Sequence, residues 1–224
     1  MTENYCSTNG IELFYKKRGK GRPLLLLHGN GESNVIFDAL CDKLSKDYIV
    51  YSIDSRGHGK SSVVKELDYN VMAEDIVGFI KTLELQKPIL YGFSDGGIIG
   101  LIIAIKYPEL LSNLIVSGVN IAPSGIKIIY RYLFRLIYFF TKSHLYRIML
   151  TQPNIENSEL KKIKVPVLIT AGQNDMIKDI HTKMIAENIT ESELLILPKE
   201  SHSSYIVNSD KMYGIIKSFC KRRF

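Results

Sequence analysis

Short strand-like runs alternate with amphipathic segments along most of this chain, and each run ends in polar or glycine residues. Seven such runs can be distinguished, and a segment with helical spacing follows most of them. Runs that are apolar on both faces are typical of strands buried in a parallel sheet, which helices connect. The expected strands are 11–15, 24–27, 48–53, 88–91, 114–117, 165–170 and 194–197. The expected helices are 33–45, 70–83, 95–107, 180–188 and 210–219. The pattern predicts an α/β fold with helices on both faces of a mostly parallel sheet.

The alternation is interrupted once, in the second half of the chain. Between the fifth and sixth expected strands, about 45 residues show no strand pattern. Residues 126–150 favour one or two helices and are rich in Tyr and Phe. We therefore expect residues 1–119 and 164–224 to form the core of one domain. Residues 120–163 are expected to form a helical cap over the carboxyl edge of its sheet.

A G-x-S-x-G pentapeptide, Gly92-Phe93-Ser94-Asp95-Gly96, follows one expected strand and opens the next helix. The two glycines fit a very tight strand-to-helix turn in which no Cβ has room on either side of the serine. Such a turn holds the hydroxyl above a helix N-terminus, whose free N–H groups can stabilise an oxyanion. In this setting the motif predicts that Ser94 is a catalytic nucleophile. The alternative is a glycine-rich turn ahead of a buried helix.

A serine hydroxyl needs a base to remove its proton, and we expect a histidine at another strand end to be that base. His202 is the best placed of the five histidines because it follows the last expected strand after a short loop. His144 lies in the expected cap and His181 in an expected helix, where a surface position is the simpler interpretation. His28 follows a strand and His58 lies in a glycine-rich turn, and packing of these turns explains both.

A carboxylate should hold the imidazole in one tautomer and stabilise its protonated form. Asp175 follows the penultimate expected strand and is the preferred candidate. Asp179 is expected on the next helix, and Glu200 is only two residues from His202 in a loop, so both rank lower. The candidate catalytic residues are then Ser94, Asp175 and His202.

Five segments carry a resemblance to the α/β-hydrolase superfamily, in the order and spacing found there: Leu24–Gly31, Asp54–Ser61, Gly92–Gly97, Val165–Asp175 and Ser201-His202. The resemblance implies an eight-stranded, mostly parallel sheet flanked by helices, with the cap inserted after strand 6. It implies the chain order nucleophile, acid, base. It also implies that the backbone N–H groups of Asn30 and Asp95 form the oxyanion hole. The turn from Asp54 to Ser61 looks structural in that family.

Two details narrow the resemblance. Members that use a carboxylate as nucleophile are set aside because Ser94 occupies the elbow. The Ser-Asp-Gly-Gly sequence of the elbow is similar to that of valacyclovirase-like esterases, which implies that the Asp95 side chain faces a cationic group of the substrate. The alternative for Asp95 is a carboxylate that caps the following helix.

The resemblance implies a serine hydrolase that cleaves carboxylic esters through an acyl-enzyme intermediate. Rings of the cap and the elbow would line a pocket for small to medium, partly apolar esters, and we name Phe93, Tyr130, Phe134 and Tyr138 for it. The alternative for the cap rings is packing on their own domain. The alternative functions on this fold are a C–C bond hydrolase, a cofactor-free haloperoxidase or perhydrolase, and a non-catalytic ligand-binding homologue.

Composition sets limits on these interpretations. With 46% hydrophobic and 23% charged residues the chain is typical of globular domains. The three cysteines, Cys6, Cys41 and Cys220, are far apart and form no CxxC pair, which favours a reducing compartment and argues against a zinc site. The first residues show no signal-peptide pattern, so we expect a cytoplasmic protein. No cofactor and no metal are expected.

The net charge of +6 is concentrated in the expected cap. Residues 110–155 contain no Asp or Glu, but five basic residues: Lys127, Arg131, Arg135, Lys142 and Arg147. The first three are four apart and would form a basic stripe on a helix. A solvated outer face is the simplest explanation. Contact with an anionic membrane surface or an acidic partner, or attraction of anionic substrates, is the alternative. No membrane-spanning segment is expected, and nucleic acid is the least favoured partner.

Overall fold

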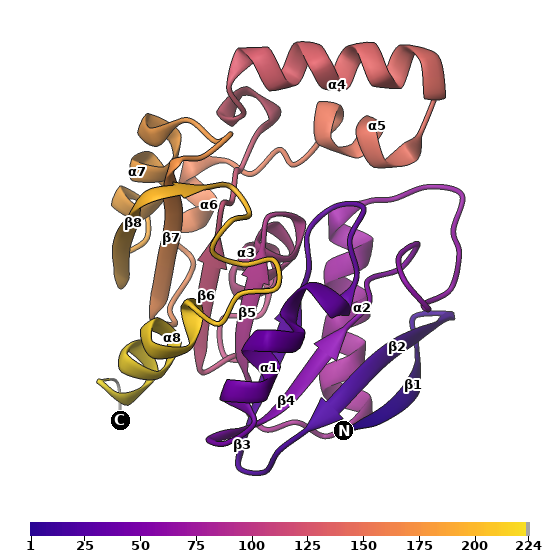
Figure 1. Ribbon diagram of the computed structural model, residues 1–224, viewed down its shortest axis with the longest axis vertical. Coiled ribbons are helices and arrows are strands. Elements are labelled where there is room, and N and C mark those ends of the chain that lie inside the picture. Colours follow the sequence, from indigo (N-terminus) through magenta and orange to yellow (C-terminus); the bar gives the residue numbers. More distant parts are fainter. Residues whose placement is uncertain (223–224) are drawn as a thin grey trace.

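The eight strands of the computed structural model, which describes residues 1–222, form one sheet in the order β1-β2-β4-β3-β5-β6-β7-β8 (Figure 1). The strands are β1 (Thr2–Thr8), β2 (Ile11–Arg18), β3 (Arg22–Leu27), β4 (Tyr48–Ile53), β5 (Ile89–Phe93), β6 (Asn113–Ser117), β7 (Val167–Asn174) and β8 (Ser192–Ser201). All neighbours from β4 to β8 pair in parallel. The predicted mostly parallel α/β sheet is therefore confirmed.

The antiparallel end of the sheet contains the one strand that the apolar pattern does not predict. Strand β1 pairs antiparallel with β2, which itself runs antiparallel to β4. In β1 only Cys6 and Thr8 are buried, while their neighbours are exposed or half-buried. An edge strand of this kind has no continuous apolar run, and so the sequence pattern does not reveal it.

Helices cover both faces of the sheet because successive strand residues point to opposite sides. They are α1 (Asp38–Leu44), α2 (Tyr69–Thr82), α3 (Asp95–Lys106), α4 (Ile128–Thr141), α5 (His144–Thr151), α6 (Asn157–Leu160), α7 (Asp179–Glu187) and α8 (Met212–Lys221), with 3-10 turns η1 (Asn34–Phe37) and η2 (Pro123–Gly125). Leu24 and Leu26 of β3 pack with residues of α1 and α8. Leu25 and Leu27 pack with residues of α2 and α3 on the other face.

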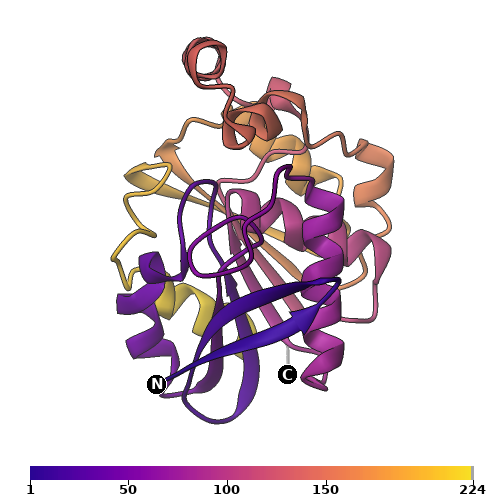
Figure 2. The same ribbon diagram turned by 90° about the vertical axis from the view of Figure 1, so that its right-hand side faces the viewer.

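The segment between β6 and β7 consists of η2, α4, α5 and α6. Helices α4 and α5 form an arm at the top of Figure 1, and Figure 2 shows α4 nearly end-on above the rest of the chain. The base of this arm is attached to the loop after β7. Lys127 N–H donates to the Met176 carbonyl at 2.8 Å, and Ile126 bridges to Ile177. The segment is thereby fixed beside the carboxyl end of β7.

The turn after β4 is held by buried polar groups. Asp54 accepts hydrogen bonds from the backbone N–H groups of Asn34 and Lys60 at 2.7 and 2.8 Å. Two residues further, the Arg56 guanidinium meets the Asp75 carboxylate of α2 through two nitrogens, and these side chains are only 11% and 1% exposed. Paired charges in this setting tie the turn to the helix layer.

Removal of one partner of this pair should be costly, because it leaves the other charge buried and uncompensated. We predict that Asp75→Ala lowers the free energy of unfolding by about 3–5 kcal/mol. Glu66→Ala breaks an exposed pair with Arg147 and should cost no more than about 1 kcal/mol. Urea denaturation of both variants measures this difference, and equal losses would contradict the structural role given to Asp75.

Candidate active site

Ser94 occupies a strained turn between β5 and α3. Its backbone φ of 50° and ψ of −112° lie outside the conformations that non-glycine residues normally adopt. Close approach of the neighbouring chain enforces this turn: a Cβ at Gly92 would overlap the carbonyl of Gly96, and a Cβ at Gly96 would overlap the carbonyl of Leu27 in β3. Backbone strain of this kind persists only where the surroundings hold it, as they do here.

The structure brings the three expected catalytic side chains together. His202 Nε2 lies 3.2 Å from Ser94 Oγ, and His202 Nδ1 lies 2.7 Å from Asp175 Oδ1. Asp175 also accepts the Ile177 N–H at 2.9 Å, and its side chain is only 1% exposed. The carboxylate is thus fixed from the loop after β7, while the histidine reaches it from the loop after β8.

Two residues that take no part in proton transfer pack closely against the His202 ring. Phe93 is buried, and its ring centre lies 5.0 Å from that of His202. Gly118, just past β6, has a φ of +61°, and a Cβ there would come within 2.8 Å of the His202 ring. Sequence reasoning uses Gly118 only as a strand end, although a glycine directly after a buried strand is a signal for close packing.

The backbone N–H groups of Asn30 and Asp95 have no hydrogen-bond partner in the described part of the chain. Asp95 is the first residue of α3, where helical N–H groups have no partner within the helix. Asn30 follows β3 and is anchored through its side chain, which donates to the Leu145 carbonyl in α5 at 2.9 Å. These are the two N–H groups that are expected to form the oxyanion hole.

A buried carboxylate adjoins the elbow. Asp95 is 4% exposed and accepts a hydrogen bond from Tyr69 Oη at 2.7 Å, while its Oδ2 has no partner. Burial raises the pKa of Asp95 to about 7, against the opposing effects of the Tyr69 hydrogen bond and of the nearby Asn30 side chain. Nearby, burial also raises the pKa of Glu32, which accepts the Gly29 N–H at 2.9 Å. Sequence reasoning did not identify Tyr69 or Glu32, because neither lies in a recognisable motif.

The other histidines lie away from the triad geometry. His28 is buried, accepts the Ser55 N–H at 3.0 Å, and its ring lies 5.1 Å from that of His58. Both therefore pack the turns, as expected, and burial lowers the pKa of each, for His28 to about 4. The surface position expected for His181 is wrong: it is half-buried and accepts the Ile121 N–H at 3.1 Å.

The two lower-ranked acids are also placed by the structure. Asp179 is exposed at the start of α7. Glu200 interacts with Lys211 and with Ser204 Oγ, and these hydrogen bonds lower its pKa. Among residues 1–222, Asp175 is the carboxylate with a hydrogen bond to the His202 ring.

The rings expected to line a pocket are divided between different surroundings. Phe134 is buried in a small cluster with Ile126 and Ile177, and its ring lies 5.9 Å from that of Tyr146. Tyr130 is 36% exposed and Tyr138 is half-buried. Phe134 therefore packs within the segment, which is the alternative given for the cap rings.

The prediction that Lys127 begins a solvent-exposed basic stripe is wrong. Lys127 Nζ does not face solvent with Arg131 and Arg135, but donates to the carbonyl of Asp175 at 2.6 Å. The start of α4 and the loop of the candidate acid are thereby joined through a side chain as well as through the backbone. A lysine directly before a helix gives no sequence signal for such a contact.

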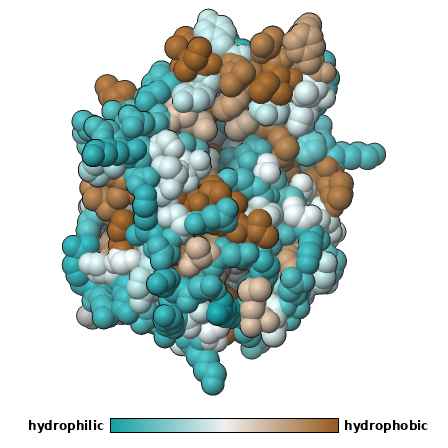
Figure 3. Space-filling model, in the orientation of Figure 1, coloured by the Kyte–Doolittle hydropathy of each residue, from teal (hydrophilic) through white to brown (hydrophobic). Residues whose placement is uncertain are grey.

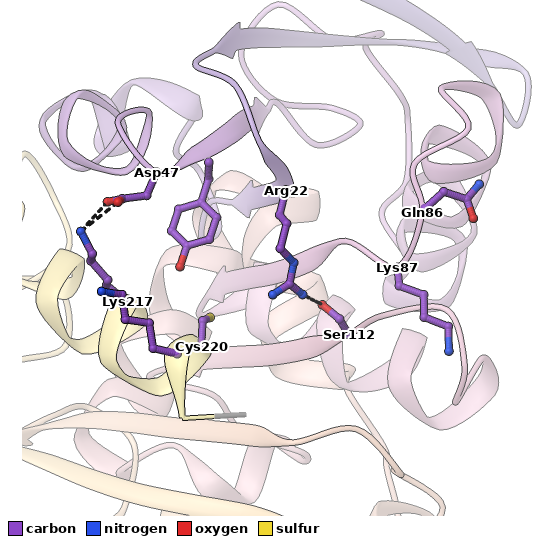
Figure 4. A pocket seen from close by; sticks show the side chains of 9 residues that line it. Arg22, Asp47, Gln86, Lys87, Ser112, Lys217 and Cys220 are labelled. Carbon is purple, nitrogen blue, oxygen red and sulfur yellow. Dashed lines mark hydrogen bonds and ion pairs between the residues drawn. The ribbon is translucent and has the colours of Figure 1, made fainter. Parts of the chain in front are cut away.

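A pocket of about 630 Å³ lies at the opposite edge of the sheet, by the amino ends of the strands (Figure 4). Its lining is formed by Arg22, Asp47, Tyr48, Gln86, Lys87, Ser112, Lys217, Cys220 and Lys221. Lys217 pairs with Asp47 at 2.8 Å, and Arg22 donates to Ser112 Oγ at 3.1 Å. Ligands of parallel sheets bind at the carboxyl ends of the strands, and this pocket lies at the other end.

Residues 1–222 contain no cluster of three or more His, Cys, Asp or Glu that could hold a metal ion. Cys6, Cys41 and Cys220 are free and buried. In the same range, no helix is both long and apolar enough to cross a lipid bilayer.

Together, a serine on a strained strand-to-helix turn and a doubly wound parallel sheet are the features of α/β hydrolases. The chain belongs to the alpha/beta hydrolase fold family, whose model matches residues 22–142, more than half of its length. That family supports hydrolytic activity.

Individual proteins of known sequence or structure are similar to this chain over nearly its whole length. Human serine hydrolase BPHL is 26% identical over 254 residues, which cover 98% of this chain and 86% of that protein. The enol-lactonase of Burkholderia xenovorans LB400 has a TM-score of 0.81 at 20% identity, over 97% of this chain and 100% of that one. A thermophilic esterase from Thermogutta terrifontis has a TM-score of 0.80 at 20% identity, over 100% and 99%. The two structures show that the fold is shared.

The raised pKa of Asp95 makes a prediction for stability. The folded pKa, about 7, lies above the ordinary value of 3.8, so the native state favours the protonated carboxyl. The free energy that the protonated carboxyl contributes to folding is fully present below about pH 4 and is lost as pH rises through about 7. The loss is roughly 1.4 kcal/mol for each unit by which the folded and unfolded pKa values differ. Asp95→Asn should therefore be more stable than the wild type at pH 8, and its advantage over the wild type should be much smaller at pH 4.

Urea denaturation at the two pH values tests this. The exposed Asp179→Asn is the matched control, and its difference from the wild type should not change with pH. A pH-independent difference for Asp95→Asn would contradict the assignment of a buried carboxyl with a raised pKa.

Proposed function

We propose that this protein is a carboxylic ester hydrolase in which Ser94 is the nucleophile, His202 the general base and Asp175 the supporting acid. The observation that carries the proposal is the line of contacts from Ser94 Oγ through His202 to Asp175, at 3.2 and 2.7 Å, beside a helix N-terminus. Nucleophile, base and orienting carboxylate are within the reach that serine catalysis needs.

Acylation starts with proton transfer from Ser94 Oγ to His202 Nε2. As the proton leaves, Oγ attacks the carbonyl carbon of the ester, and the carbonyl oxygen becomes an oxyanion. The N–H groups of Asn30 and Asp95 donate to this oxyanion, and such donors are typically worth about 3–4 kcal/mol each in the transition state. The Asp175 carboxylate stabilises the imidazolium through its bond to Nδ1.

Collapse of the tetrahedral intermediate breaks the bond to the alcohol, which leaves with the proton from His202. Water then enters, gives a proton to His202 Nε2, and its oxygen attacks the acyl carbon. The second intermediate releases the carboxylic acid, and the proton returns from His202 to Ser94. The cycle consumes one water for each ester and leaves the enzyme unchanged.

Ester cleavage is the simplest of the candidate reactions, because it needs neither peroxide nor a second carboxylate on the substrate. A C–C bond hydrolase, a haloperoxidase or perhydrolase would use the same three residues, and a ligand-binding homologue would use none of them. A panel of acetate-to-octanoate esters, a vinylogous diketone and an ester with added peroxide distinguishes these chemistries. We expect turnover of short and medium esters, since the buried Phe93 ring gives the site an apolar wall.

Ser94→Ala should reduce ester turnover at least about a thousandfold, because nothing else in the site can form the acyl-enzyme. Hydrolysis of p-nitrophenyl esters measures this loss. Ser218→Ala, on the exposed side of α8, is the matched control and should keep full activity. Unchanged circular dichroism and melting temperature show that the fold is intact. Substantial turnover by Ser94→Ala would refute the proposed mechanism.

A preference for α-amino esters is a second candidate, and the partnerless Oδ2 of Asp95 favours it. A buried carboxylate with an unused oxygen next to the nucleophile can accept a hydrogen bond from a substrate ammonium group. The capping alternative for Asp95 has less support, since its side chain binds Tyr69 Oη and not a helix N–H. Glu32 adds a second acidic group close by.

We predict a higher kcat/KM for the p-nitrophenyl ester of valine than for that of 3-methylbutanoate, which differs only in the amino group. Asp95→Asn should reduce this preference about tenfold or more, in the range of hydrogen bonds to charged groups. The measurement is the ratio of kcat/KM for the two esters, compared between the wild type and Asp95→Asn. If the wild type cleaves both esters equally well, Asp95 has no role in recognition of the amine.

A further inference from the structure

Helix α4 presents an apolar face to the outside of the molecule. Seven of its apolar side chains are strongly exposed, from 48% at Leu133 to 74% at Phe140. At 100° per residue they fall within an arc of about 140°. The members of this outer face are Ile128, Ile129, Tyr132, Leu133, Leu136, Phe139 and Phe140. Only Phe134 on the inner side of α4 is buried. An apolar cluster accordingly marks the top of the molecule in Figure 3, where α4 lies.

Three cations border the outer face along one edge. Arg131 and Arg135 share one side of the helix by their spacing, and Lys142 follows its last residue. No carboxylate pairs with these three cations among residues 1–222. Two of them lie over exposed rings: the Arg135 guanidinium is 5.9 Å from the Tyr132 ring centre, and Lys142 Nζ is 4.9 Å from that of Phe139. No acidic residue interrupts this surface, since residues 110–155 contain none.

This combination has a specific physical meaning. Large contiguous exposed apolar patches are uncommon on soluble monomers and mark interaction sites. An apolar face with aromatic side chains and an adjoining row of Arg and Lys is suited to lie in the plane of a lipid interface, where rings enter the acyl boundary and cations meet anionic headgroups. A second copy of the chain suits the surface less well, since pairing two such faces would bring six unpaired cations together.

We propose that α4 is a docking helix that binds the surface of an anionic lipid membrane. The base of α4 is hydrogen-bonded to the loop of Asp175 through Lys127, so the docked membrane would lie close to Ser94 and its partners. If the proposed ester hydrolysis is correct, esters dissolved in the membrane would reach the site from there. Membrane binding itself does not depend on that activity and is measured without it.

Sedimentation of the protein with sucrose-loaded vesicles tests the proposal. Vesicles of equimolar phosphatidylcholine and phosphatidylglycerol should bind the wild type, and vesicles of phosphatidylcholine alone should bind it much less. Arg131→Glu with Arg135→Glu should weaken binding to the anionic vesicles at least about tenfold. Phe139→Ser with Phe140→Ser should weaken it to a similar extent, because the apolar contact is lost.

The matched control reverses the same number of charges elsewhere. Lys20 and Lys46 are exposed at the amino edge of the sheet, before β3 and β4, and Lys20→Glu with Lys46→Glu should leave vesicle binding within about twofold. The α4 variants should also keep wild-type melting temperature and unchanged turnover of a water-soluble ester without vesicles.

Several results would overturn the proposal. They are failure of the wild type to bind anionic vesicles, equal binding to vesicles without phosphatidylglycerol, or an equal loss in the control variant. Light scattering provides a further criterion. A wild-type dimer that becomes monomeric in Phe139→Ser with Phe140→Ser, with no vesicle binding by either form, would assign the outer face to a second copy of the chain.

Discussion

The close approach of β3, the turn after β5 and the start of α3 is the constraint on which the rest of the site depends. Gly92 and Gly96 leave no space for a Cβ, and Ser94 between them is held at a positive φ. That conformation is unfavourable in isolation, and the buried parallel strands stabilise it. As a consequence, Ser94 Oγ lies 3.2 Å from His202 Nε2, at the start of α3.

Two buried aspartates, Asp95 and Asp175, lie beside this turn, and their environments differ. Asp175 is held by His202 and a backbone N–H, which suits a charged carboxylate beside an imidazole. Asp95 is buried with one hydrogen bond and one unused oxygen, and its pKa rises to about 7. In our account the first carboxyl supports the chemistry, and the second provides a means of recognising charge on the substrate. Burial and hydrogen bonding give the two aspartates these different properties.

Much of this arrangement could be predicted from sequence because it depends on local pattern. Apolar runs predict the buried strands, and the glycine spacing around Ser94 predicts the turn, since both follow from short-range sterics. Long-range contacts could not be predicted. The polar edge strand β1, the inward turn of Lys127 to the Asp175 carbonyl and the contact between Tyr69 and Asp95 depend on segments far apart in the chain. Helix α4 is the reverse case, because its apolar pattern predicts burial of one face, whereas the fold leaves that face outside.

Covalent labelling tests whether His202 activates Ser94 as a nucleophile, without any assumption about the natural substrate. A fluorophosphonate forms a stable adduct only with an activated serine, and mass spectrometry of the digested protein locates it. We expect a single adduct, on the peptide that contains Ser94, and its rate of formation should be greatly reduced in His202→Ala. No adduct on the folded wild-type protein, or an adduct on Ser94 that forms equally fast in His202→Ala, would contradict it.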